Sequence, residues 1–64
     1  MLNEKDIKTI EEKLNNCSDT FYKTQNVGLK ELNRGYCQGI AFVLEKLGYS
    51  VEWDNGKAIV VEND

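Results

Sequence analysis

Residues 33–49, "NRGYCQGIAFVLEKLGY", follow a helical pattern at nearly every position, yet two glycines stand four residues apart at Gly35 and Gly39. A glycine in a helix interior costs roughly 1 kcal/mol relative to alanine, because it loses more conformational freedom on folding. Small residues at this spacing let a second helix backbone approach closely. We therefore expect a helix-packing seam here, filled either by the first helix of the same chain or by a second subunit.

The helix that carries these glycines is predicted over about residues 20–47, ending at Gly48, which suits a left-handed C-terminal cap. On a helical wheel its large apolar side chains gather within about 80°, the width of one helix face. We expect the core face to consist of Leu29, Leu32, Tyr36, Ile40, Val43 and Leu47. The seam beside it consists of Gly28, Gly35, Gly39 and Phe42.

A shorter helix is predicted over about residues 4–15. Asn3 can cap its N-terminus, and Leu2 and Ile7 flank that cap as a hydrophobic staple. The next stretch, "NNCSDT" (residues 15–20), is rich in cap and turn formers, so we expect the chain to bend there.

A continuous helix is the alternative to this bend. A 3-4-3-4 apolar spacing runs straight through the polar stretch, at Ile7, Ile10, Leu14, Cys17 and Phe21. One helix reaching residue 47 would be roughly 60 Å long, which is too long for a compact domain of this size. The bend is therefore the favoured prediction.

The C-terminal part, residues 49–62, predicts a β-hairpin. Asn55-Gly56 is a strong signal for a two-residue turn, because both central positions need a positive φ. Such a turn pairs Asp54 with Lys57, Trp53 with Ala58, Val51 with Val60 and Tyr49 with Glu62. The face formed by Tyr49, Val51, Trp53, Ala58 and Val60 is expected to lie on the second helix. Ile59 and Val61 point the other way and would leave an apolar strip on an open strand edge, so we predict a subunit or partner contact there.

Together these elements predict an α+β fold in one small domain, residues 1–64: an αα-hairpin followed by a C-terminal two-stranded antiparallel β-hairpin. A chain of this length buries only about 60% of its unfolded surface, so its fold needs an additional source of stability, such as a disulfide, a metal ion or a partner subunit. Two cysteines without any histidine cannot complete a zinc shell, and the charged N-terminus predicts a cytoplasmic protein with reduced thiols. The remaining source of stability is a homo-oligomer, with a dimer favoured.

The residue types argue against catalysis. Without histidine there is no ordinary general base near neutral pH, and no base is implied beside Cys17 or Cys37. We predict no enzyme activity, no cofactor and no metal. A net charge of −3 without a basic block argues against nucleic-acid binding, and no apolar run is long enough for a membrane span.

The run "GYCQGIAFVLEKLGYSVEW" (residues 35–53) resembles small accessory proteins of Gram-positive phages and mobile elements, in which a helix ending this way leads into a hairpin. The resemblance rests on structural positions: Gly39, Leu44, Leu47, Gly48 and Tyr49. It implies a phage-derived protein that blocks a host protein by occlusion, as anti-CRISPR and other anti-defence proteins do. It carries over no functional residue.

The expected contact residues for such a binding protein are Gly35, Gly39, Phe42, Ile59 and Val61. An alternative function is an oligomeric sponge for a nucleotide signalling molecule, held by the donor groups of Lys30, Arg34 and Gln38. A DNA-binding accessory protein ranks third, because the second helix offers solvent only two basic residues set among acids.

Overall fold

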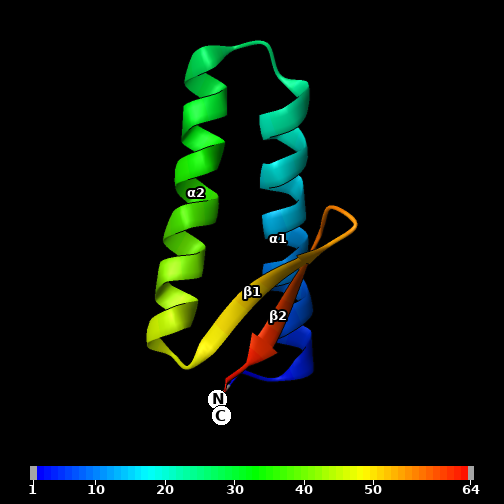
Figure 1. Cartoon of the computed structure of the whole chain (residues 1–64), viewed down its shortest axis with the longest axis vertical. Coiled ribbons are helices and arrows are strands. Elements are labelled where there is room, and N and C mark those ends of the chain that lie inside the picture. Colours follow the sequence, from blue (N-terminus) through cyan, green and yellow to red (C-terminus); the bar gives the residue numbers. More distant parts are fainter. Residues whose placement is uncertain (1, 64) are drawn as a thin grey trace.

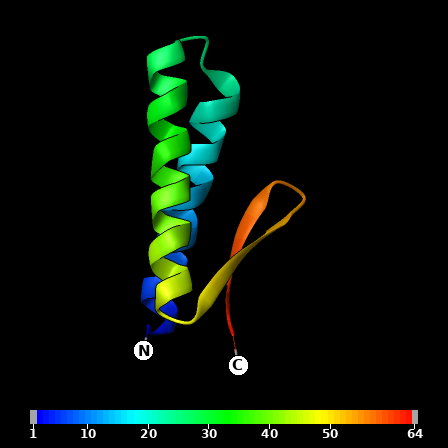
Figure 2. The same ribbon diagram turned by 60° about the vertical axis from the view of Figure 1, so that its left-hand side comes forward.

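The computed structural model describes residues 2–63 as two helices followed by a hairpin, namely α1 (Glu4–Lys23), α2 (Val27–Lys46), β1 (Tyr49–Asp54) and β2 (Lys57–Glu62). The helices run side by side in opposite directions, and the hairpin crosses the half of the pair where the chain begins (Figure 1). Figure 2 shows the hairpin leaning away from the helices toward its tip. The predicted α+β order is confirmed.

The start of α1 follows the predicted capping chemistry. The Asn3 side chain accepts a hydrogen bond from the backbone N–H of Asp6 at 2.8 Å, and Leu2 and Ile7 both pack against the core. A second hydrogen bond holds the N-terminal end of α1, because the Leu2 N–H donates to the Tyr49 hydroxyl at 3.1 Å. The beginning of α1 is thereby joined to the beginning of β1.

The predicted bend at residues 15–20 is wrong, and α1 continues to Lys23. Leu14 and Cys17 are buried, so the apolar spacing that runs through the polar stretch outweighs its local preference for turns. The chain reverses at Thr24–Asn26 instead. The Asn26 side chain there accepts from the Leu29 N–H at 3.0 Å and caps α2, which begins at Val27 rather than near residue 20.

The predicted core face of α2 is also wrong. Leu44 is buried and Cys37 is half-buried, although neither belongs to the predicted face, and Ile40 is the one member of that face that is half-buried. The core side of α2 therefore lies around Cys37 and Leu44. The other members of the predicted face are 45–57% exposed: Leu29, Leu32, Tyr36, Val43 and Leu47. α2 is therefore rotated by part of a turn from its expected orientation.

The hairpin has the predicted turn and register. Asn55 and Gly56 both have positive φ, at 51° and 80°, and the Cα pairing joins Asp54 to Lys57 and Tyr49 to Glu62. Gly48, with φ 91°, makes the left-handed turn that leads out of α2. The core forms where this sheet meets both helices: Leu14, Leu44, Tyr49, Ala58 and Val60. Trp53 departs from the prediction, because it is 47% exposed near the hairpin tip.

Candidate interaction surfaces

The side of α2 turned away from the hairpin is apolar and uncovered. We call it the open face, formed by Gly28, Leu29, Leu32, Gly35, Tyr36, Gly39, Val43 and Leu47. Its large side chains are about half exposed, from 45% for Leu29 to 57% for Leu47. Single exposed apolar residues are normal on a protein surface, whereas a contiguous row along a whole helix marks an interaction site.

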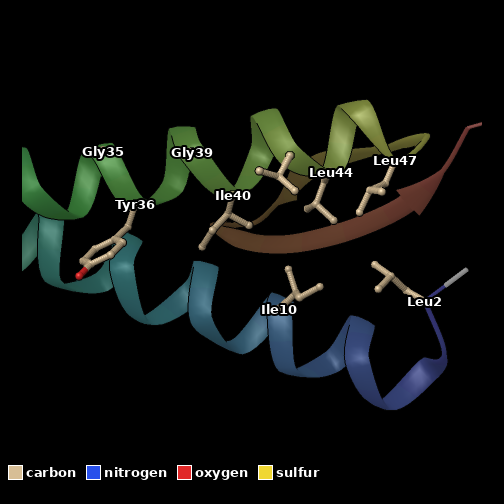
Figure 3. Close-up of a pocket in the computed structure, with 9 residues that line it drawn as sticks. Leu2, Ile10, Gly35, Tyr36, Gly39, Ile40, Leu44 and Leu47 are labelled. Atoms are coloured by element: carbon tan, nitrogen blue, oxygen red, sulfur yellow. The ribbon is translucent and has the colours of Figure 1, made fainter.

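A groove of about 490 Å³ runs along this face between the two helices. Ile10 of α1 and Leu2, just before α1, line one side of it, and the remaining residues come from α2 and its C-cap Leu47. In Figure 3 the labelled side chains of Tyr36, Ile40 and Leu44 point into the space between the helices, with the hairpin behind them. The groove is long, shallow and apolar, which suits another apolar surface better than a polar small molecule.

The two glycines lie on the rim of this groove with free space in front of them. A Cβ atom built on Gly35 or Gly39 would meet no atom within 4 Å outside its own helix backbone. The interpretation that α1 of the same chain fills the glycine seam is therefore wrong. Contact of the seam with a second subunit stays a prediction.

Phe42 lies on α2 next to the glycine seam. It is 59% exposed, and the Lys46 ammonium lies 5.3 Å from its ring centroid. This cation–π contact leaves most of the ring accessible, so the predicted contact role of Phe42 is sterically open.

The outer edge of β2 is not open, in contrast to the expectation for Ile59 and Val61. The N–H groups of Ala58 and Val60 point away from β1 and donate to α1 side chains, namely to Asn15 Oδ1 at 2.7 Å and to Glu11 Oε2 at 2.8 Å. These two caps block further strand pairing at β2. Ile59 itself is 40% exposed on the outer face of the hairpin, while Val61 is half-buried.

Sequence reasoning missed the capping roles of Glu11 and Asn15. They stand one helical turn apart on the flank of the apolar stripe of α1, which is the only trace of their function in the sequence. Their partners lie more than forty residues away along the chain, so local patterns could not identify them.

The edge of β1 has a different environment. Beside it, a groove of about 610 Å³ separates β1 from α2 and is lined on the helix side mainly by Gln38, Ala41 and Glu45. Within residues 2–63, no hydrogen-bond acceptor reaches the N–H groups of Val51 and Trp53 from this side. The two edges of the sheet thus differ: α1 side chains satisfy one, and the other faces a groove.

The side chains of Lys30, Arg34 and Gln38, predicted to bind a nucleotide, do not all line one site. The Lys30 ammonium lies 5.1 Å from the Phe21 ring centroid, and Arg34 forms an exposed ion pair with Glu31 at 3.6 Å. Arg34 and Gln38 do line one groove of about 330 Å³, together with the aromatic rings of Phe21, Tyr22 and Trp53. Lys30 does not line this groove.

The cysteines are free and belong to the helix interface. Cys17 is buried, and the Cys37 thiol donates a long hydrogen bond to the Leu14 carbonyl at 3.8 Å. Burial, followed by the neighbouring Cys17, raises the pKa of Cys37 above its ordinary value. A raised pKa lowers the thiolate fraction at neutral pH, which is the opposite of what an activated nucleophile needs.

Metal-ligand clusters and membrane-spanning helices are both absent from residues 2–63. In this part of the chain, no three His, Cys, Asp or Glu side chains come close enough to hold a metal ion. Neither of its helices has an apolar, weakly charged run of the length that a bilayer crossing requires.

Comparison with known proteins adds no relative to this description. No protein-family model, curated protein or solved structure gives a significant match to the chain.

Proposed function

We propose that this protein is a non-enzymatic binding protein that forms a homodimer through the open face of α2 and blocks a target protein by covering part of its surface. The open face carries the proposal, because a row of half-exposed large side chains beside two unobstructed glycines suits a packed helix. Among residues 2–63 only six hydrophobic side chains are buried, so a second copy would add a large share of the apolar burial.

The dimensions of the molecule agree with a dimer contact on this side. The Cα trace extends 38 Å and 21 Å along its two longer axes, a rectangle of about 800 Å². A stable interface of standard size buries about 800 Å² on each partner. Two copies joined through the groove side would form a four-helix core with one hairpin on each outer surface.

The open face is also complementary to itself. If two α2 helices cross antiparallel about a two-fold axis level with residues 37 and 38, Tyr36 of one copy faces Gly39 of the other. In the same register Leu32 faces Val43, and Leu47 faces Gly28. Two of the three helix glycines thus receive a large side chain, which is the alternation that close packing requires. In this register the close contacts at Gly28 and Gly39 offset the cost of these glycines to the helix.

The target-blocking part of the proposal rests on the resemblance to phage accessory proteins and on the outer face of the hairpin, which a dimer of this kind would leave accessible. Ile59 and Val61 are the residues proposed to contact the target. We place the activity in the cytoplasm of a bacterial host, where unbridged Cys17 and Cys37 are the normal state. Anti-CRISPR and other anti-defence targets are the class that this origin suggests.

Sedimentation equilibrium of the wild-type chain tests the dimer. The expected mass is twice 7.3 kDa at high concentration, and Val43→Glu should return it to 7.3 kDa because the two new charges, one from each copy, would not fit the apolar contact. The exposed Glu45→Gln change on the polar side of α2 serves as the control. A wild-type chain that stays monomeric over the whole range would refute the dimer.

Target blocking needs its own experiment. Wild type and the double variant Ile59→Thr, Val61→Thr are used as baits in a host lysate, and each captured protein is then assayed for its own activity. The proposal requires one captured protein to lose activity in proportion to the bound chain, and the double variant to retain its dimer mass but bind more weakly. Captured proteins that keep full activity would contradict occlusion.

The groove shared by Arg34, Gln38 and Trp53 favours nucleotide sequestration as the second candidate. Its aromatic rings could stack on a base, and the guanidinium could pair with a phosphate. Trp53 is the only tryptophan in the chain, so its fluorescence reports directly on this groove. Titration with ATP, cyclic AMP and cyclic di-AMP should quench it if this candidate holds, and Arg34→Gln should weaken the effect; unchanged fluorescence excludes these three ligands.

A further inference from the structure

We propose that the outer edge of β1 accepts an extended segment of the target protein as a third strand of the sheet, seated in the groove between β1 and α2. This inference rests on the proposed function, because it specifies how the target is held. It is carried by the hydrogen-bonding state of the two sheet edges, which the register of the hairpin determines.

The register fixes which backbone groups point outward. In an antiparallel pair closed by a two-residue turn, hydrogen-bonded pairs alternate with non-hydrogen-bonded pairs, beginning with a bonded pair at the turn. Asp54 and Lys57 are that first pair, so the next pair, Trp53 and Ala58, points its N–H and C=O groups outward. The hydrogen bond from the Ala58 N–H to Asn15 agrees with this direction.

The same rule applies to the pair of Val51 and Val60. The Val60 N–H donates outward to Glu11, so the N–H of Val51 points outward on the opposite edge. On the β2 side, α1 therefore satisfies the outward donors of Ala58 and Val60. On the β1 side, the donors of Val51 and Trp53 face a groove of about 610 Å³. A row of backbone donors and acceptors at strand spacing is matched by another extended backbone.

The helix layer leaves room for this strand. Two packed helices with axes about 10 Å apart present a layer roughly 20 Å wide, whereas two strands spaced about 4.8 Å apart cover only about half of it. β2 packs on α1 and β1 on α2, so the uncovered part on the β1 side lies over the outer flank of α2. Ala41 is the smallest side chain on that flank, between Gln38 and Glu45, and a strand can approach the helix closely there.

The occupant is accordingly an extended segment with apolar residues at alternate positions, since successive side chains of a strand point to opposite faces. One set would lie over Ala41 and Cys37, and the other would continue the outer surface of the hairpin that carries Ile59. A helical segment would leave the edge donors of β1 without partners.

A display library of random twelve-residue peptides is the probe, selected against the full chain. The selected peptides should show period-two apolar alternation, and amide exchange at Val51 and Trp53 should slow at least tenfold when the best peptide binds. Val51→Pro removes the outward N–H without touching the ladder to β2, and it should weaken binding about tenfold or more.

Should Val51→Pro disturb the hairpin, Ala41→Arg provides a second variant, because it fills the helix side of the groove and leaves the β1 backbone intact. It should abolish peptide binding, while Thr20→Arg on the exposed surface of α1 should not change it. Selected peptides with helical periodicity, or unchanged exchange at Val51, would overturn the proposal. So would slow exchange at Val51 that depends on protein concentration without any peptide, because a second copy would then occupy the edge.

The outcome is separable from that of the proposed function. A chain that binds strand-forming peptides but remains monomeric refutes the dimer and keeps this site. A dimer that blocks its target through β1-independent contacts, with Val51→Pro fully active, refutes this site and keeps the proposed function.

Discussion

Replacing Gly35 and Gly39 together by alanine separates a glycine seam that is packed from one that is exposed. Neither glycine has a positive φ, and a Cβ at either position meets nothing within the chain. In an isolated subunit the double variant should therefore gain helix propensity, roughly 1 kcal/mol per site or about 2 kcal/mol in all. For a domain of this size that gain raises the Tm by roughly 8–16 °C.

In the dimer an opposing effect acts on association. With Tyr36 of the second copy against Gly39, the methyl group added at residue 39 overpacks the contact at a cost of about 1–3 kcal/mol. The gain in helix stability is already present in the isolated subunit and cancels in association, so the dimer contact itself only loses free energy, about 2–6 kcal/mol for the two symmetric contacts. Each 1.4 kcal/mol of that loss weakens the dimer tenfold.

Thermal unfolding at a low and at a roughly hundredfold higher protein concentration measures both the stability of the subunit and the strength of association, since only a dimer has a Tm that rises with concentration. The wild-type Tm should rise with concentration, whereas the double variant should start higher and rise little. Glu45→Ala on the polar side of α2 should retain the wild-type dependence. Equal stabilisation of the double variant at both concentrations would refute packing on the glycines.

The remaining predictions concern the fold that supports these surfaces. Asn15→Ala leaves the outward N–H of β2 without its acceptor in a partly buried position, and urea unfolding should show a loss of about 1–3 kcal/mol; an unchanged midpoint would show that the cap is dispensable. Gly48→Ala forces a side chain into a φ of 91°, and calorimetry should show a destabilisation of about 1–2 kcal/mol. Reductant should leave the Tm unchanged because Cys17 and Cys37 are not bridged. The raised pKa of Cys37 should make its alkylation by iodoacetamide at neutral pH slower than that of free cysteine. A faster reaction would contradict the burial of this thiol.

Local chemistry explains which features could be predicted from the sequence. The cap at Asn3, the left-handed turn at Gly48 and the turn at Asn55-Gly56 each depend on a few neighbouring residues, and the structure has all three. The strand register followed from the turn length alone. These features need no knowledge of the rest of the chain.

Features that depend on tertiary packing could not be predicted in the same way. Residues 15–20 favour turns locally, but burial of Leu14 and Cys17 against α2 and the hairpin keeps them helical. α2 is apolar or small over more than half of its circumference, so the wheel shows several candidate core faces without selecting one. The choice of the Leu44 flank depends on where β1 and α1 lie.

The interaction surfaces likewise combine features that the local sequence predicts with features that depend on tertiary packing. The glycine seam is visible in the sequence because glycine is costly within a helix, although the sequence did not indicate that α1 lies elsewhere. The asymmetry of the sheet edges was not visible, because Glu11 and Asn15 meet β2 only through the fold.

The packing of Tyr36 against Gly39 across a two-fold axis is the contact on which the proposed dimer most depends. An isotope-filtered NOE experiment on an equal mixture of labelled and unlabelled chains detects only contacts between copies. It should show cross-peaks from the Tyr36 ring to the Gly39 Hα protons, and from Leu32 to Val43, at concentrations where the mass is that of a dimer. A dimer that lacks these cross-peaks, or the absence of any contact between copies at millimolar concentration, would contradict the account.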